Sequence, residues 1–212
     1  MIRAAVFDVG ETLVRDDRYW ADWADWLQVP RHTMSALVGA VVAQGRDNAD
    51  AVGLARPGCD ITAEWAAREA AGRGEVLDEQ DLYDDVRTAL AFLQDAGIWV
   101  GITGNQSQKA AAMLRALHLP CDALATSGEW GVAKPAPQFF HRLVEWVPHR
   151  PVEIVYVGDH PANDLAPAAA AGLRTAHLRR GPLGHLWADT PEAAAADWHA
   201  DSLTELAALL TP

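Results

Sequence analysis

Cysteine is scarce in this chain, and its scarcity limits the chemistry that the fold can use. Of 212 residues two are cysteines, Cys59 and Cys121, which stand far apart and lack the spacing of metal ligands. We therefore expect neither a disulfide framework nor a zinc site. A protein of the reducing cytoplasm fits this composition best.

Basic residues and long apolar runs are lacking as well. Lys and Arg number 17 against 29 Asp and Glu, which gives a formal net charge of −12. We expect no nucleic-acid partner and no anionic membrane partner, because proteins bind both through clusters of Lys and Arg. No apolar run approaches the ~20 residues of a transmembrane helix. The run after Arg3 ends at Asp8, which is too early for a signal peptide.

What is present is a globular composition with 50% apolar residues, over a length that suits one α/β domain with a modest insertion. Strand-like and helix-like segments alternate along most of it. This alternation predicts right-handed βαβ units, and hence an α/β fold with a doubly wound parallel sheet and helices on both faces. Strands are expected up to Asp8 and over 98–102, 123–126, 152–157 and 173–178, and loops over 48–60 and 179–188.

Residues 16–82 follow a different pattern. No strand-like alternation occurs there, and Trp20, Trp23 and Trp26 recur at every third position. Such a stripe is typical of the core of a small helical bundle. We expect an all-helical domain over 16–82, inserted after the first strand, and a core domain made of 1–15 and 83–212.

The stretch 4–14 carries the strongest functional signal. A run of small and apolar residues ends at Asp8, and Gly10 follows. Ligands of open α/β sheets bind beyond the carboxyl ends of the strands, so Asp8 is expected at the functional site. Taken alone, the pattern also suits an Asp that caps a turn.

Three further segments place candidate site residues at strand ends or before a helix. These are Thr103, Gly104 and Asn105; Lys134; and Asp159 and Asp164. Parallel strands end at one edge of their sheet. We therefore expect Asp8, Thr103 and Asp159 to share that edge, with Lys134 on a loop above it.

In the order and spacing of these four segments, the chain resembles the haloacid dehalogenase (HAD) superfamily of phosphohydrolases. The resemblance implies a Rossmann-like core sheet, with residues 16–82 in the place of a C1-type cap. It also implies Mg²⁺-dependent hydrolysis of a small phosphorylated substrate through an aspartyl-phosphate.

The resemblance gives each of these residues a role. Asp8 would be the nucleophile, while Thr103, Lys134 and the backbone N–H groups of Gly104 and Asn105 would hold the phosphoryl group. The magnesium ligands would be Asp8, the main-chain carbonyl of Gly10, Asp159 and Asp164. For Asp164, contact through a water and the orientation of Lys134 are alternatives.

Position 10 departs from the family pattern. Phosphatases of this superfamily carry a second Asp there, which protonates the leaving group and then activates water, whereas Gly10 has no side chain. A general acid/base contributes roughly 10²–10⁴-fold. We expect Glu11, Asp16 or Asp17, or His160 to replace it, or a leaving group that needs no protonation.

Other interpretations stay open. A 2-haloacid dehalogenase also lacks the second Asp, but it works without metal, whereas the Gly158-Asp159 pair favours one. Phosphonate hydrolysis through a Schiff base needs a cap lysine, and residues 16–82 contain none. A non-catalytic binding or scaffold protein of the same fold is the remaining class.

Overall fold

The computed structural model describes residues 1–211 and divides the chain into two compact units. One unit combines Met1–Arg15 with the residues from Asp78 on, and the other is Asp16–Leu77. None of the helices in the described range is long and apolar enough to cross a membrane.

The chain returns to the first unit earlier than residue 83, the boundary expected from the sequence. Arg15 N donates to Asp81 O at 2.7 Å, and Tyr83 N donates to Leu13 O at 3.0 Å. Val14 and Leu82 form an antiparallel bridge between these hydrogen bonds. The backbone that precedes Tyr83 is therefore bonded to the end of the first segment.

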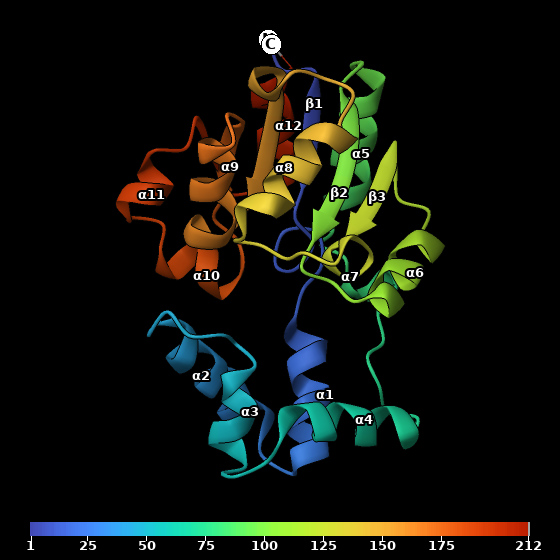
Figure 1. Ribbon diagram of the computed structural model, residues 1–212, viewed down its shortest axis with the longest axis vertical. Coiled ribbons are helices and arrows are strands. Elements are labelled where there is room, and N and C mark those ends of the chain that lie inside the picture. The colour runs from blue at the N-terminus through green and yellow to red at the C-terminus, as the bar shows by residue number, and fades with distance from the viewer. Residues whose placement is uncertain (212) are drawn as a thin grey trace. The chain divides into compact units, whose positions relative to one another are not determined.

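The first unit is built on a parallel six-stranded sheet with the strand order β3-β2-β1-β4-β5-β6. Figure 1 shows β1, β2 and β3 side by side and pointing the same way. Every residue of β1 and β4 is buried, as expected for central strands covered on both faces. The strands are β1 Ala4–Phe7, β2 Trp99–Gly104, β3 Ala123–Thr126, β4 Ile154–Gly158, β5 Arg174–Leu178 and β6 Trp198–Ala200.

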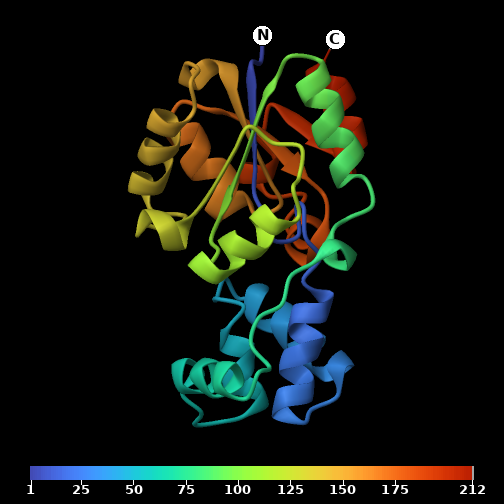
Figure 2. The same ribbon diagram turned by 90° about the vertical axis from the view of Figure 1, so that its right-hand side faces the viewer.

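Helices cover both faces of this sheet. Figure 2 shows α8 and α9 on one side of the strands and α5 and α12 on the other. The helix α8 packs through Phe139, Phe140 and Leu143 against β1 and β4 side chains. The helices of this unit are α5 Val86–Asp95, α6 Gln108–Ala116, α7 Ser127–Trp130, α8 Pro137–Trp146, α9 Ala166–Ala170, α10 Gly181–Leu186, α11 Pro191–Ala194 and α12 Leu203–Leu210. The predicted doubly wound α/β fold is confirmed.

The second unit is helical throughout its regular elements, α1 Asp17–Leu27, α2 Arg31–Val42, α3 Asp50–Ala55 and α4 Ile61–Ala70. Trp20 and Trp23 of the tryptophan stripe are buried, whereas Trp26 is half-buried and donates from Nε1 to Glu64. The stripe therefore supplies core packing, as predicted. That this unit acts as a cap stays a prediction.

Three segments differ from the sequence expectation. The predicted loop 48–60 contains α3, and the predicted loop 179–188 contains α10. The strand β6 was not expected, because its three residues form a strand only by pairing with β5, with Leu178 opposite Ala200. Short elements of this kind depend on tertiary partners rather than on local periodicity.

Candidate active site

The carboxyl ends of β1, β2 and β4 bring three of the expected residues together. Phe7 is in register with Ile102 and with Val157, so the residues that follow them also lie side by side. Asp8, Thr103 and Asp159 are all buried there. The expected edge of the sheet is thus observed, although the roles of these residues stay predictions.

Lys134 lies among the carboxylates. Its Nζ is 2.7 Å from Asp8 Oδ1 and 2.5 Å from Asp164 Oδ1, and these side chains are almost completely buried. Burial alone would lower the pKa of the Lys134 ammonium, but Asp164 and Asp8 together outweigh it and raise that pKa well above its usual value. The lysine is therefore a fixed positive charge beside Asp8.

Two glycines let these side chains approach the sheet. A Cβ on Gly104 would lie 2.4 Å from Asp8 Oδ1, and a Cβ on Gly158 would lie 2.3 Å from Asp164 Oδ2. Both distances are below 3.0 Å, and non-bonded Cβ atoms essentially never approach other atoms so closely. The site therefore requires glycine at the ends of β2 and β4.

Asn105 has a contact that the sequence did not reveal. Its side chain donates from Nδ2 to Lys134 O at 2.9 Å and accepts from Lys134 N at 2.8 Å. These two hydrogen bonds join the lysine loop to the end of β2. Asn105 was predicted only through its backbone N–H, and the pairing of its amide with a residue 29 positions away leaves no local sequence signal.

Asp164 is fully buried, and both of its carboxylate oxygens have protein partners. Oδ1 pairs with Lys134, and Oδ2 accepts from His160 N at 3.0 Å. Asp164 lies within the wide helical turn Pro161–Leu165. The contact with Lys134 favours one of the alternatives considered for Asp164, the orientation of that lysine, and its role stays a prediction.

The residues present fit a divalent cation. Asp8, Asp159 and Asp164 each offer an oxygen, and these atoms lie within 4.8 Å of one another. Asp159 Oδ2 is buried and has no hydrogen-bond partner among residues 1–211. Burial raises the pKa of Asp8 to about 6 against the opposing charge of Lys134. Burial, together with Asp164 and Asp8, also raises the pKa of Asp159. One lysine does not balance these carboxylates, so the cluster favours a cation.

Thr103 presents an unused hydroxyl at the same place. The residue is fully buried, and its Oγ1 has no hydrogen-bond partner within the described residues. A buried hydroxyl without a partner loses free energy relative to water. An anion bound beside Asp8 and Lys134 would give this group an acceptor.

A second cluster surrounds Glu11, which adopts a left-handed backbone conformation with φ of 54°. Tyr83 OH donates to Glu11 Oε2 at 2.5 Å, and the Arg180 guanidinium lies 4.1 Å from the centre of the Tyr83 ring. Arg180 also donates to Thr12 O at 3.1 Å and to Asp85 Oδ2 at 2.6 Å. Neither Tyr83 nor Arg180 was predicted as a site residue, since Tyr83 meets Glu11, and Arg180 meets Tyr83, only through the tertiary fold.

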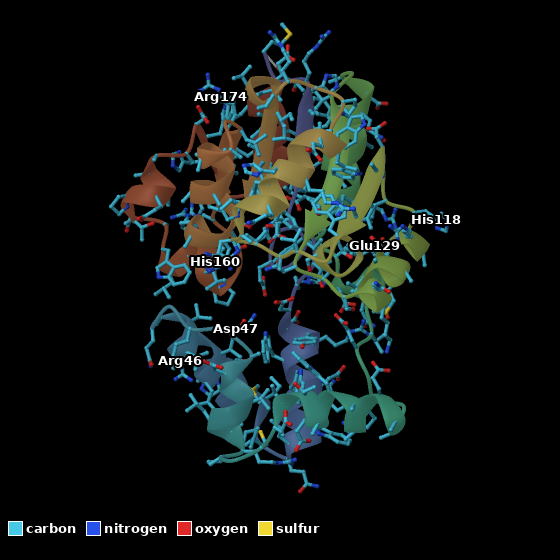
Figure 3. The ribbon with its side chains drawn as sticks, in the orientation of Figure 1. Arg46, Asp47, His118, Glu129, His160 and Arg174 are labelled. Atoms are coloured by element: carbon cyan, nitrogen blue, oxygen red, sulfur yellow. The ribbon has the colours of Figure 1, made fainter. Side chains whose placement is uncertain are left out.

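His160 lies at the carboxyl end of the sheet, on the side of α10, whereas Arg174 lies at the opposite end (Figure 3). Burial, with a smaller contribution from Lys134, lowers the pKa of His160 to about 4. The centre of the His160 ring lies 4.7 Å from the centre of the Trp187 ring. The imidazole is therefore neutral beside the acidic cluster at neutral pH.

Comparison with known proteins agrees with this geometry. Residues 2–172 match the family described as haloacid dehalogenase-like hydrolase. A ribulose-1,5-bisphosphate 5-phosphatase from Halopiger xanaduensis is 34% identical over 129 residues, which cover 58% of this chain and 51% of that protein. A glyceraldehyde 3-phosphate phosphatase from Methanopyrus kandleri is 34% identical over 102 residues, 47% of this chain and 44% of the relative. The chain thus spans about half the length of the curated relatives that it matches.

Solved structures share the fold over the whole chain. The putative HAD-hydrolase YfnB from Bacillus subtilis, bound to magnesium, has a TM-score of 0.74 at 18% identity and covers 100% of this chain and 99% of its own. A defluorinating L-2-haloacid dehalogenase has a TM-score of 0.67 at 25% identity and covers 100% of this chain and 96% of its own. Both phosphatase and dehalogenase chemistries therefore occur among the proteins that this chain resembles.

Proposed function

Because the chain belongs to the haloacid dehalogenase-like hydrolase family, we propose that it is a Mg²⁺-dependent phosphatase acting on a small phosphorylated metabolite through Asp8. The observation that carries the proposal is the ion pair between buried Asp8 and Lys134 at the end of β1. The unpartnered Thr103 hydroxyl and Asp159 oxygen beside it supply a donor for phosphate and a ligand for a cation. The phosphatases among its relatives support the same chemistry.

The chemistry proceeds in two steps. An Asp8 carboxylate oxygen attacks phosphorus, the bond from phosphorus to the leaving oxygen breaks, and that oxygen takes up a proton from a general acid. Water then attacks the aspartyl-phosphate and gives a proton back to the same group, the bond between Asp8 and phosphorus breaks, and inorganic phosphate leaves with the Asp8 carboxylate restored. Throughout, Lys134 offsets the charge of the phosphoryl oxygens, and the Thr103 hydroxyl donates to one of them. Backbone N–H groups of Gly104 and Asn105 contribute further donors.

Asp8, Asp159 and the Gly10 carbonyl would hold the magnesium ion, with Asp164 joining through a water or acting only through Lys134. When bound, the ion supplies Lewis-acid compensation for charge on the phosphoryl oxygens. The net negative charge of the buried carboxylates supports this assignment.

We assign the acid/base function missing at Gly10 to Glu11. The Tyr83 hydroxyl fixes its carboxylate, and Glu11 is close enough to Asp159 to contribute to the raised pKa of that carboxyl. Asp16 and Asp17, the other carboxylates considered, belong to the helical unit. Glu11→Gln is expected to slow turnover of p-nitrophenyl phosphate more than that of acetyl phosphate, whose leaving group needs less protonation.

The proposed function is tested by turnover of p-nitrophenyl phosphate and acetyl phosphate, with Mg²⁺ and with EDTA. We expect metal-dependent release of phosphate that Asp8→Asn abolishes. Turnover retained by Asp8→Asn would remove Asp8 from the mechanism. If the folded protein hydrolyses neither compound but releases chloride from 2-chloropropionate, the dehalogenase alternative replaces this proposal. Silence in all three assays would favour a binding or scaffold role.

A further inference from the structure

The imidazole of His160 is held in one tautomer by its own loop. Asn163 N donates a hydrogen bond to His160 Nδ1 at 3.2 Å. A ring nitrogen that accepts a hydrogen bond carries no proton, so in the neutral ring the proton is on Nε2. His160 therefore presents an N–H donor on the side of the ring that faces away from the loop.

Within residues 1–211 this donor has no acceptor, because no hydrogen bond involves His160 Nε2. The atom is also not fully enclosed by the surrounding side chains. His177 shows the contrast, because its Nε2 is enclosed and unpartnered. The open Nε2 of His160 is thus available to a ligand, whereas that of His177 is not.

The donor is also held in position. The Trp187 ring packs at 53° to the His160 ring, with 4.7 Å between ring centres. The backbone N–H of His160 donates to Asp164 Oδ2 at 3.0 Å, the carboxylate whose other oxygen holds Lys134. One carboxylate therefore positions both the lysine beside Asp8 and the loop that carries the imidazole.

We propose that His160 Nε2–H donates a hydrogen bond to a hydroxyl oxygen of the leaving alcohol near the phosphoryl group, and so selects phosphate esters of polyols or sugars over simple alkyl phosphates. The inference rests on the proposed phosphatase function and names the substrate class of that site. Helix capping by Nδ1 explains why position 160 holds an acceptor, but it does not require a second, open donor nitrogen.

The test compares glycerol 3-phosphate with propyl phosphate, which lacks the two hydroxyl groups. His160→Asn retains an acceptor for Asn163 N but loses the Nε2 donor. We expect it to lower kcat/KM for glycerol 3-phosphate about tenfold, the effect of losing one hydrogen bond of about 1.4 kcal/mol, and that for propyl phosphate by less than about twofold. His160→Gln, whose amide reaches the Nε2 position, should recover part of this selectivity. Equal losses on both esters, or no loss on either, would overturn the proposal.

A binding measurement separates this proposal from the proposed function. Calorimetry with the Asp8→Asn variant reports glycerol 3-phosphate affinity without turnover. Weaker binding in the Asp8→Asn/His160→Asn double variant supports the His160 contact even if the wild type hydrolyses nothing. Unchanged affinity would overturn the contact while leaving phosphatase activity intact. Nitrogen-15 NMR of the His160 ring checks the tautomer directly, and a proton found on Nδ1 would remove the premise.

Discussion

At the scale of single residues, the site depends on side chains that are absent as much as on those that are present. Gly104 and Gly158 let the Asp8 and Asp164 carboxylates lie directly against the sheet. Gly10 has no side chain where the phosphatases of the family carry an Asp. At the next position, the Glu11 carboxylate accepts a hydrogen bond from the Tyr83 hydroxyl. The left-handed backbone of Glu11 costs roughly 1 kcal/mol or more, and this hydrogen bond offsets part of that cost.

Replacing Gly104 by Ala is expected to abolish most activity. Its Cβ would lie 2.4 Å from Asp8 Oδ1, so Asp8 must leave Lys134 or the strand must shift, at about 1–3 kcal/mol in the free energy of unfolding. We expect kcat for p-nitrophenyl phosphate to fall at least about 100-fold, since small misplacements of reacting groups have effects of that order.

The matched control is Gly39→Ala in the helix α2. Apart from the backbone of its own helix and its chain neighbours, no atom of residues 1–211 lies within 4 Å of a Cβ at that position. Alanine favours a helix over glycine by about 0.5–1 kcal/mol. Its activity should be unchanged, and its melting temperature should be equal or higher. Activity of Gly104→Ala at the level of this control would contradict the close approach of Asp8.

His160 predicts a pH dependence of stability. Its pKa is lowered from 6.5 to about 4, so the unfolded chain binds more protons between these values. The buried neutral ring therefore contributes to the free energy of unfolding above pH 6.5, and this contribution is lost as the pH falls toward 4. Asp8, with a raised pKa of about 6, acts in the opposite direction, so the comparison must be made between variants.

The free energy of unfolding, measured by urea in EDTA from pH 7 to pH 4, should decrease more steeply in the wild type than in His160→Asn. The difference between the two proteins isolates the histidine, because both retain Asp8. Parallel curves for the two proteins would show that His160 is not buried as a neutral ring.

At the scale of elements, the lysine loop and the end of β2 act as one piece. The two hydrogen bonds between the Asn105 side chain and the Lys134 backbone join them. Position and charge of Lys134 are thereby set from two sides, by this backbone contact and by the carboxylates at its ammonium group.

Asn105→Ala removes both hydrogen bonds and leaves two half-buried backbone groups without them. We expect it to lower the free energy of unfolding by about 1–3 kcal/mol and kcat by about tenfold, with a smaller change in KM. Asn105→Asp keeps the acceptor for Lys134 N and should lose less stability. An alanine variant with wild-type kcat would show that the loop holds Lys134 without this contact.

At the scale of the whole molecule, Arg180 connects segments that are far apart in the sequence. It bonds Thr12 O and Asp85, and Asp85 in turn accepts from Leu203 N at the start of α12. Arg180 lies beyond residues 2–172, which match the family. The C-terminal segment therefore contributes to the conformation of the turn that follows Asp8.

Arg180→Met is expected to lower the free energy of unfolding by about 3–5 kcal/mol, because it leaves the partly buried Asp85 carboxylate without its positively charged partner. Arg174→Ala, which breaks the exposed pair with Asp197, is the control and should have little effect. Equal melting temperatures for the two variants would show that Arg180 does not hold these segments together.

The sequence by itself determined the doubly wound α/β fold, the helical insertion and the edge where Asp8, Thr103 and Asp159 meet. These features follow from local periodicity and from the geometry of parallel strands, which need no knowledge of distant contacts. The missing side chain at Gly10 can likewise be read from the sequence alone.

Only the tertiary structure decided the contacts of Asn105, Tyr83 and Arg180, the hydrogen bond from His160 N to Asp164, and the short elements α10 and β6. Each depends on a side chain or a backbone group from a distant part of the chain, or on a short element that forms only against its neighbours. Such interactions leave no period in the sequence, because their partners are set by folding rather than by chain order.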